Sequence, residues 1–242
     1  MVRMNFFILN GYPKLENGDR TPSKNYRIGT KCRDLDLMEE TKTVVFDLGA
    51  VLIDWNPRYL YKKIFAEEAK MEWFLEHICT SDWNEEQDAG RNFKTATDLL
   101  IQQHPEWEHE ILAFWHRWEE MLAGPITGTV EILSTLRMAK RHQLLALTNW
   151  SAETFPIAQK KFDFLSWFDG IVMSGEEKTR KPFRDFYQIM LNRYSLKPEQ
   201  CLFIDDNLRN IEGAAQLGIE GIHFTKPEEL KAELVKRSIL VG

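Results

Sequence analysis

Short apolar runs rich in β-branched residues recur along the chain from Thr43 onward, and each is typical of a strand buried on both faces of a parallel sheet. They read TVVFD at 43–47, HQLLALTN at 142–149, GIVMS at 170–174, CLFIDD at 201–206 and GIHF at 221–224. Helical patterns fill the intervals at about 128–139, 152–162, 183–194 and 207–218. This alternation predicts an α/β fold with a doubly wound, Rossmann-like parallel sheet, which binds its ligand at the carboxyl ends of the strands.

One interval breaks the alternation, because residues 58–124 contain several helical stretches and no convincing strand pattern. We interpret this interval as a helical cap inserted after the first strand, with Pro57 and Gly124-Pro125 at its two connections. Its longest helical stretch, EWEHEILAFWHRWEEML, carries tryptophans spaced as one helix face, so we expect them in the core of the cap. These are Trp107, Trp115 and Trp118.

The rest of the chain divides around this cap. Residues 41–57 and 125–242 make up the predicted core. Residues 1–40 mix Gly, Pro, Lys, Asn and Asp without helical or strand periodicity, so we interpret them as an N-terminal appendage outside the catalytic fold. Met38 stands just before the first strand and is a reasonable alternative start.

Composition and charge exclude several classes of protein. The chain has 242 residues, of which 43% are hydrophobic and 28% charged, as in ordinary globular domains and unlike disordered chains. Its net charge of −6 argues against nucleic acid and anionic membrane as partners, and no apolar run reaches the ~20 residues of a membrane span. The cysteines Cys32, Cys79 and Cys201 lie far apart without CxxC spacing, which indicates reduced thiols in a cytoplasmic protein.

Polar residues gather at the ends of the predicted strands in four short segments. These are Asp47-Leu48-Gly49-Ala50-Val51-Leu52, Leu147-Thr148-Asn149, Arg180-Lys181-Pro182 and Ile204-Asp205-Asp206-Asn207. Because the carboxyl ends of parallel strands share one edge of the sheet, the fold would gather all four around one crevice. In this order, and with the cap after the first of them, they resemble the four motifs of the haloacid dehalogenase (HAD) superfamily, in its Asp-Leu-Gly sugar-phosphatase and dehalogenase-like branch.

The acidic residues of these segments suit a magnesium ion. Asp47, Asp205 and Asp206 supply the hard carboxylate oxygens that Mg²⁺ prefers, and a cation allows a carboxylate to approach a phosphate anion. The resemblance implies that Asp47 is both nucleophile and metal ligand. It also implies that the Gly49 carbonyl is a second ligand, and that Asp206 or Asp205 completes the protein's share.

The second and third segments suit the phosphoryl group itself. Thr148 and Asn149 can donate a hydroxyl and amide hydrogens to phosphoryl oxygens, and Lys181 places a compact positive charge between phosphate and nucleophile. The basic neighbours of this lysine are expected to form a solvated face. These are Lys178, Arg180 and Arg184.

The first motif departs from that of most HAD phosphatases, which carry a second aspartate two residues after the nucleophile as general acid and base. In this chain the position is Gly49, which cannot transfer a proton. General acid–base catalysis of this kind contributes about 100- to 10,000-fold in rate, so its loss matters. Either the leaving group scarcely needs a proton, or Asp54 or Asp88 substitutes. In the small-capped members that the chain resembles, the cap loop selects the substrate, so Asp88 and Arg91 are candidate substrate-binding residues. Ordinary surface roles are the alternative for both.

The combined residues predict a Mg²⁺-dependent phosphatase that hydrolyses a small phosphorylated metabolite, with a sugar phosphate favoured, through an aspartyl-phosphate on Asp47. A metal-independent 2-haloacid dehalogenase with the same nucleophile is one alternative, but without a cation Asp205 and Asp206 would repel an anionic substrate. A noncatalytic phospho-ligand-binding protein is another, and the intact Asp47 and Lys181 speak against it. We expect a monomer or a weak homodimer.

Overall fold

The computed structural model describes residues 42–241. The appendage predicted at 1–40, the alternative start at Met38 and the thiol of Cys32 lie outside these residues. Within them, no helix is both long and apolar enough to cross a membrane. The cysteines of this part of the chain are buried free thiols, Cys79 and Cys201.

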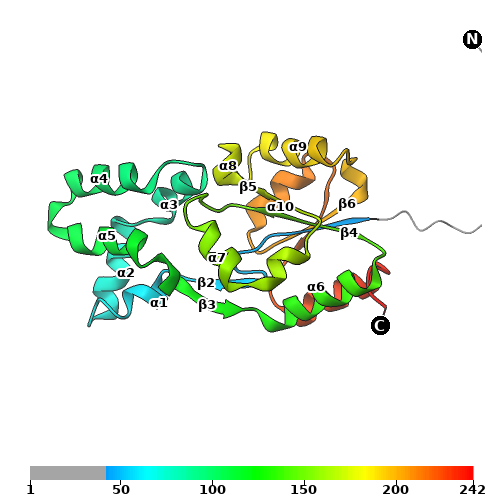
Figure 1. The fold of residues 1–242 in the computed structure, drawn as a ribbon, viewed down its shortest axis with the longest axis horizontal. Coiled ribbons are helices and arrows are strands. Elements are labelled where there is room, and N and C mark those ends of the chain that lie inside the picture. Colours follow the sequence, from blue (N-terminus) through cyan, green and yellow to red (C-terminus); the bar gives the residue numbers. More distant parts are fainter. Residues whose placement is uncertain (1–41, 242) are drawn as a thin grey trace, which may run out of the picture. The chain divides into compact units, whose positions relative to one another are not determined.

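A central sheet of five parallel strands has the order β5-β4-β1-β6-β7 (Figure 1). Its strands are β1 (Thr43–Phe46), β4 (Gln143–Thr148), β5 (Gly170–Met173), β6 (Cys201–Asp205) and β7 (Glu220–His223). In the middle strand, Val44 pairs with Leu144 on one side and with Leu202 on the other. Each strand coincides with one of the apolar runs, which confirms the predicted parallel α/β fold.

Helices cover both faces of this sheet. They are α6 (Thr127–Ala139), α7 (Phe155–Lys161), α8 (Ser174–Glu177), α9 (Arg184–Arg193), α10 (Leu208–Ala215) and α11 (Pro227–Lys236). Val44 and Phe46 pack in one hydrophobic cluster with side chains of α6, α7 and α11, whereas Val45 packs in the other with side chains of α9 and α10. Because β1 is buried on both faces, its sequence is continuously apolar rather than alternating.

A helical cap is inserted in the core between β2 (Ile53–Trp55) and β3 (Leu122–Pro125), as predicted. Its helices are α1 (Arg58–Tyr61), α2 (Glu68–His77), α3 (Ser81–Asp88), α4 (Phe93–Gln103) and α5 (Glu108–His116), with 3₁₀ turns at Pro105–Trp107 and Trp118–Met121. Figure 1 shows α1 to α5 gathered on one side of the core, with α3 beside α8. The exact bounds of the cap and core stay a prediction.

Two short strands that the sequence analysis did not predict join the cap to the core. β2 and β3 pair in antiparallel fashion, with Ile53 opposite Pro125 and Asp54 opposite Gly124. Residues 122–124 therefore form part of a strand, where we had expected only helices. Gly124 has a φ of 142°, a conformation that favours glycine. The pairing holds the two connections of the cap side by side.

The tryptophans predicted in the cap core occupy two environments. Trp107 packs against an aromatic ring of α2, with centroids 5.4 Å apart, and Trp115 stacks on a ring of α4 at 6.2 Å. Trp118 is buried in the same cluster, but its ring also lies 5.5 Å from that of Trp150, which follows β4 of the core. Trp118 therefore reaches the strand ends where the chemistry was predicted.

Candidate active site

The predicted catalytic residues lie where the central strands end. Asp47 directly follows β1, Thr148 ends β4, and Asp205 ends β6. These strands are neighbours in the sheet, and Lys181 joins them from the loop between α8 and α9. Because parallel strands present their carboxyl ends at one edge, motifs far apart in the chain meet in one place.

Lys181 occupies the middle of this group. Its Nζ lies 2.8 Å from Asp47 Oδ1 and 2.7 Å from Asp205 Oδ2, and its side chain is completely buried. Burial disfavours the charged ammonium, but the contacts with Asp205 and Asp47 outweigh this effect and raise the pKa of Lys181. The lysine is therefore a fixed positive charge between two carboxylates.

Asp47 has an unusually high pKa for a carboxyl group. Burial raises this pKa to about 8; the charge of Lys181 opposes the shift, and Asp205 and Asp206 add to it. Oδ1 accepts hydrogen bonds from Lys181 Nζ and, at 2.7 Å, from the backbone N–H of Leu48. Oδ2 has no hydrogen-bond partner in the described part of the chain, so one oxygen anchors the carboxylate and the other is available for chemistry.

The three predicted acidic ligands form one cluster. One oxygen from each of Asp47, Asp205 and Asp206 lies within 4.8 Å of the other two. The ammonium of Lys181 neutralises only one of these three carboxylates, so the cluster keeps an excess of negative charge when all are ionised. Hard oxygen donors with excess negative charge are what Mg²⁺ requires, so these residues fit the metal.

The two acids after β6 differ in their surroundings. Asp205 is buried, and its carboxylate accepts hydrogen bonds from Lys181 Nζ, from Asn207 N at 2.8 Å and from Asn210 Nδ2 at 2.9 Å. Asp206 is exposed and contacts no other side chain by hydrogen bond or ion pair among residues 42–241; partial desolvation and then repulsion from Asp205 raise its pKa. The sequence analysis left the choice of metal ligand open, and this geometry favours Asp206.

Thr148 and Asn149 have different surroundings at the end of β4. The Thr148 hydroxyl is buried and lacks a hydrogen-bond partner within residues 42–241, a costly condition that a bound ligand would relieve. Asn149 was predicted to bind phosphate, but its side chain is already paired with the backbone of Lys181, accepting from N at 2.8 Å and donating to O at 3.0 Å. Its amide therefore holds the lysine segment against β4.

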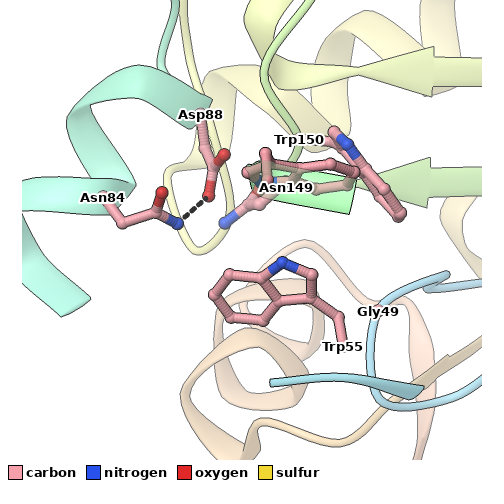
Figure 2. A pocket seen from close by; sticks show the side chains of 7 residues that line it. Gly49, Trp55, Asn84, Asp88, Asn149 and Trp150 are labelled. Carbon is pink, nitrogen blue, oxygen red and sulfur yellow. Dashed lines mark hydrogen bonds between the residues drawn. The ribbon is translucent and has the colours of Figure 1, made fainter. Parts of the chain in front are cut away.

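A cavity of about 90 Å³ opens beside Gly49 (Figure 2). Its other lining residues are Trp55, Asn84, Asp88, Trp118, Asn149 and Trp150. Side chains alternate along a strand, so β2 directs Trp55 into the cavity and Asp54 elsewhere. The Asp54 carboxylate accepts a hydrogen bond from the Tyr59 hydroxyl at 2.9 Å. The sequence analysis missed Trp55 and Trp150 as site residues, although each lies close to a motif in the chain.

The structure brings Asp88 to this cavity but not Arg91. Asp88 ends α3, and its carboxylate accepts a hydrogen bond from Asn84 Nδ2 at 3.2 Å. The Arg91 guanidinium turns back within the cap, where it donates to Gln87 Oε1 at 2.7 Å and to the Trp83 carbonyl at 3.0 Å. Asp88 is therefore the better placed of the predicted cap residues, and the binding role of Arg91 stays a prediction without support from these contacts.

The basic segment after α8 forms the solvated face that we expected only in part. The Arg180 side chain is only 13% exposed, and its guanidinium lies 3.1 Å from Glu85 of α3. Arg209 reaches the same Glu85 at 2.6 Å, and Lys178 donates to carbonyl groups of α8 and of the loop after α3. Arg184 is exposed, as predicted. Lys178 is exposed as well, so Arg180 alone of the three predicted residues is covered, because α3 of the cap packs against this loop.

The chain is similar to known proteins in sequence and in fold. A model of the haloacid dehalogenase-like hydrolase family matches residues 44–224. The sesquiterpene phosphatase astK of Aspergillus oryzae is 26% identical over 186 residues, which cover 76% of this chain and 90% of that protein. The phosphorylated carbohydrates phosphatase of Thermotoga maritima is 22% identical over 184 residues, or 75% and 84%. A HAD family enzyme from Bacteroides thetaiotaomicron, crystallised as a magnesium complex, shares the fold with a TM-score of 0.63 and 19% identity, covering 82% and 100%.

Proposed function

The chain belongs to the haloacid dehalogenase-like hydrolase family, and from this we propose that it is a Mg²⁺-dependent phosphatase that acts through an aspartyl-phosphate on Asp47. One observation carries the proposal: the buried ammonium of Lys181 lies between Asp47 and Asp205, in the acidic cluster that Asp206 completes. Asp47 is held through Oδ1 and belongs to an acidic cluster that can bind a metal ion, an arrangement that suits nucleophilic attack on a phosphate ester. Phosphatases among the relatives support the same reaction.

Three groups would hold the metal, namely the Asp47 carboxylate, the Gly49 carbonyl and the Asp206 carboxylate. When bound, Mg²⁺ supplies positive charge that neutralises the substrate's phosphate and keeps the nucleophile ionised. Asp205 would act through Lys181, which it holds in place by the 2.7 Å contact. The magnesium complex of the Bacteroides enzyme with this fold supports the choice of metal.

The remaining residues of the site act on the phosphoryl group. Asp47 Oδ2 attacks phosphorus while Lys181 stabilises the charge on the equatorial oxygens. The unpartnered hydroxyl of Thr148 donates to one of these oxygens. Asn149 keeps the lysine segment in position and has a second amide hydrogen for the phosphate. Water then attacks the phosphorus of the aspartyl-phosphate, which releases phosphate and restores the Asp47 carboxylate.

We favour a sugar phosphate as the substrate. Indole faces and polar groups line the cavity together, a combination that suits a ring with apolar faces and hydroxyl edges. Trp55 Nε1 is buried, has no hydrogen-bond partner in the described part of the chain, and would donate to a substrate hydroxyl. The Thermotoga relative acts, by its name, on phosphorylated carbohydrates, and the Aspergillus relative on a sesquiterpene. The predicted cytoplasmic location and the monomer or weak homodimer are part of this proposal.

A panel assay tests the proposal. The purified full chain is incubated with sugar phosphates, para-nitrophenyl phosphate and 2-haloacids, each with Mg²⁺ or with EDTA. We expect phosphate release that needs Mg²⁺ and disappears in Asp47→Asn but not in Asp82→Asn, an exposed control on α3. Halide release that survives EDTA would favour the dehalogenase instead. Phosphate-ester binding without any turnover would favour the noncatalytic binding protein.

A further inference from the structure

The site contains an open space at the position where a second carboxylate would stand. This position is Gly49, and a Cβ atom there would have no atom of the other described residues, apart from its two chain neighbours, within 4 Å. Gly49 comes two residues after the nucleophile Asp47 and lines the cavity, so we place the alcohol that leaves phosphorus in this cavity. A leaving alkoxide of high basicity needs a proton there, and glycine has none to give.

We propose that Asp88, at the end of α3, supplies this proton and later takes one back from water, so that the cap contributes a catalytic residue. The inference rests on the proposed phosphatase function. Asp88 and Gly49 line the same cavity, and in Figure 2 the Asp88 carboxyl points from α3 toward the space above the Trp55 ring. The other candidate, Asp54, is bound to Tyr59 and lies outside this cavity.

Hydrogen bonds to the core fix the position of Asp88. Its backbone carbonyl accepts from Ser174 Oγ at 2.6 Å, and the same Oγ accepts from Trp150 N at 2.9 Å. Trp150 directly follows Asn149, whose amide holds Lys181. A short chain of hydrogen bonds therefore joins the end of α3 to the segment that carries the phosphate-binding residues, and positioning of this kind is what efficient proton transfer needs.

The surroundings of Asp88 also suit a proton carrier. Its carboxylate has the neutral Asn84 amide as a side-chain partner, and no Lys or Arg forms an ion pair with it among residues 42–241. Burial raises the pKa of Asp88 to about 7, the charge of Glu85 adds to this shift, and a hydrogen bond from the Ser151 backbone and the charges of Arg180 and Lys181 oppose it. Near neutral pH the group can then both donate and accept a proton.

The proton balance closes over two steps. In the first, Asp47 Oδ2 forms a bond to phosphorus, the bond from phosphorus to the leaving oxygen breaks, and the Asp88 carboxylic acid gives its proton to that oxygen. In the second, the Asp88 carboxylate takes a proton from water as the water oxygen attacks phosphorus, and the bond from phosphorus to Asp47 breaks. An alcohol and inorganic phosphate leave, and both carboxyl groups return to their starting states.

The test compares kcat/KM across substituted phenyl phosphates of similar size, from para-nitrophenyl to para-methylphenyl phosphate, for wild type and Asp88→Asn with Mg²⁺. An acid matters most for the more basic phenolate, so we expect Asp88→Asn to lose about 100-fold or more on para-methylphenyl phosphate and less than about tenfold on para-nitrophenyl phosphate. Asp82→Asn, on the exposed side of the same helix, is the matched control and should change neither rate.

A second variant separates chemistry from folding. Because a side chain at position 49 has open space, Gly49→Asp in the Asp88→Asn background should recover at least about tenfold of the para-methylphenyl phosphate rate. An equal loss on all substrates in Asp88→Asn without rescue, or no loss on any, would overturn the assignment of Asp88. Absence of Mg²⁺-dependent turnover in the wild type would instead overturn the phosphatase function itself.

Discussion

Replacement of Lys181 by methionine removes the ammonium between Asp47 and Asp205 and keeps a flexible apolar side chain in its place. The side chain is completely buried and its Nζ lies 2.8 Å and 2.7 Å from the two carboxylates. The variant therefore leaves the carboxyl groups of Asp47, Asp205 and Asp206 close together without their positive partner. Both the stability of the metal-free protein and the turnover should respond.

The distances set the magnitude of the effect. At an effective dielectric constant of about 20, a pair of unit charges this close attracts by roughly 6 kcal/mol before the cost of desolvation. Desolvation cancels much of this gain, and removal of one partner from a buried ion pair costs about 3–5 kcal/mol in practice. We expect Lys181→Met to lower the metal-free unfolding free energy by that amount. Turnover should fall about 100- to 1,000-fold, because the phosphoryl charge loses a preorganised cation.

Urea unfolding with EDTA or Mg²⁺, together with kcat for para-nitrophenyl phosphate, measures both effects. Lys160→Met is the matched control, because Lys160 is exposed on α7. Mg²⁺ should stabilise Lys181→Met more than the wild type, since the carboxylates no longer have the ammonium as a competing cation. If Lys181→Met matches the wild type in metal-free stability and in turnover, the electrostatic account of this site is refuted.

Three further predictions follow from other contacts. Asp206→Asn should weaken Mg²⁺ binding about tenfold or more, equivalent to about 1.4 kcal/mol, in isothermal titration calorimetry, and unchanged affinity would remove Asp206 from the ligands. Burial raises the pKa of Asp88 from 3.8 to about 7, so the folded state favours its protonated form. In the metal-free protein this contribution to the unfolding free energy is fully present below pH 3.8 and is lost as the pH rises through about 7. Asp88→Asn should flatten that loss in urea unfolding across this pH range, and an unaltered slope would contradict the shift. Gly175→Ala should cost about 1–3 kcal/mol of unfolding free energy, because its Cβ would approach Ala152 N to 2.4 Å and Trp150 O to 2.7 Å. Wild-type stability of this variant would contradict the close packing of α8 against the segment after β4.

The strands and motifs of the core were predictable because burial on both faces leaves a simple signal. Val44, Val45 and Phe46 all had to be apolar, so β1 reads as one run that ends at Asp47. The end of a parallel strand then determines where the next polar side chain lies, and this is why Asp47 and Asp205 could be placed together from the sequence alone.

The contacts between cap and core could not be predicted in the same way. The strand pair of β2 and β3 is too short to leave a periodic pattern. In the sequence Arg180 belongs to a basic segment that was predicted to be exposed. Its ion pair with Glu85 arises only because α3 packs against this segment in the folded protein. The different surroundings of Asp205 and Asp206 likewise depend on partners such as Asn210, which the chain supplies from the following helix.

Chemical trapping of the covalent intermediate tests the central claim most directly. The wild-type protein is mixed with para-nitrophenyl phosphate and Mg²⁺, treated with borohydride during turnover, and digested for peptide mass spectrometry. Borohydride reduces an aspartyl-phosphate to homoserine, so we predict homoserine at position 47 when both substrate and Mg²⁺ are present, and unmodified aspartate when either is omitted. Steady phosphate release with position 47 always unmodified, or with the reduced residue elsewhere in the chain, would contradict Asp47 as the nucleophile.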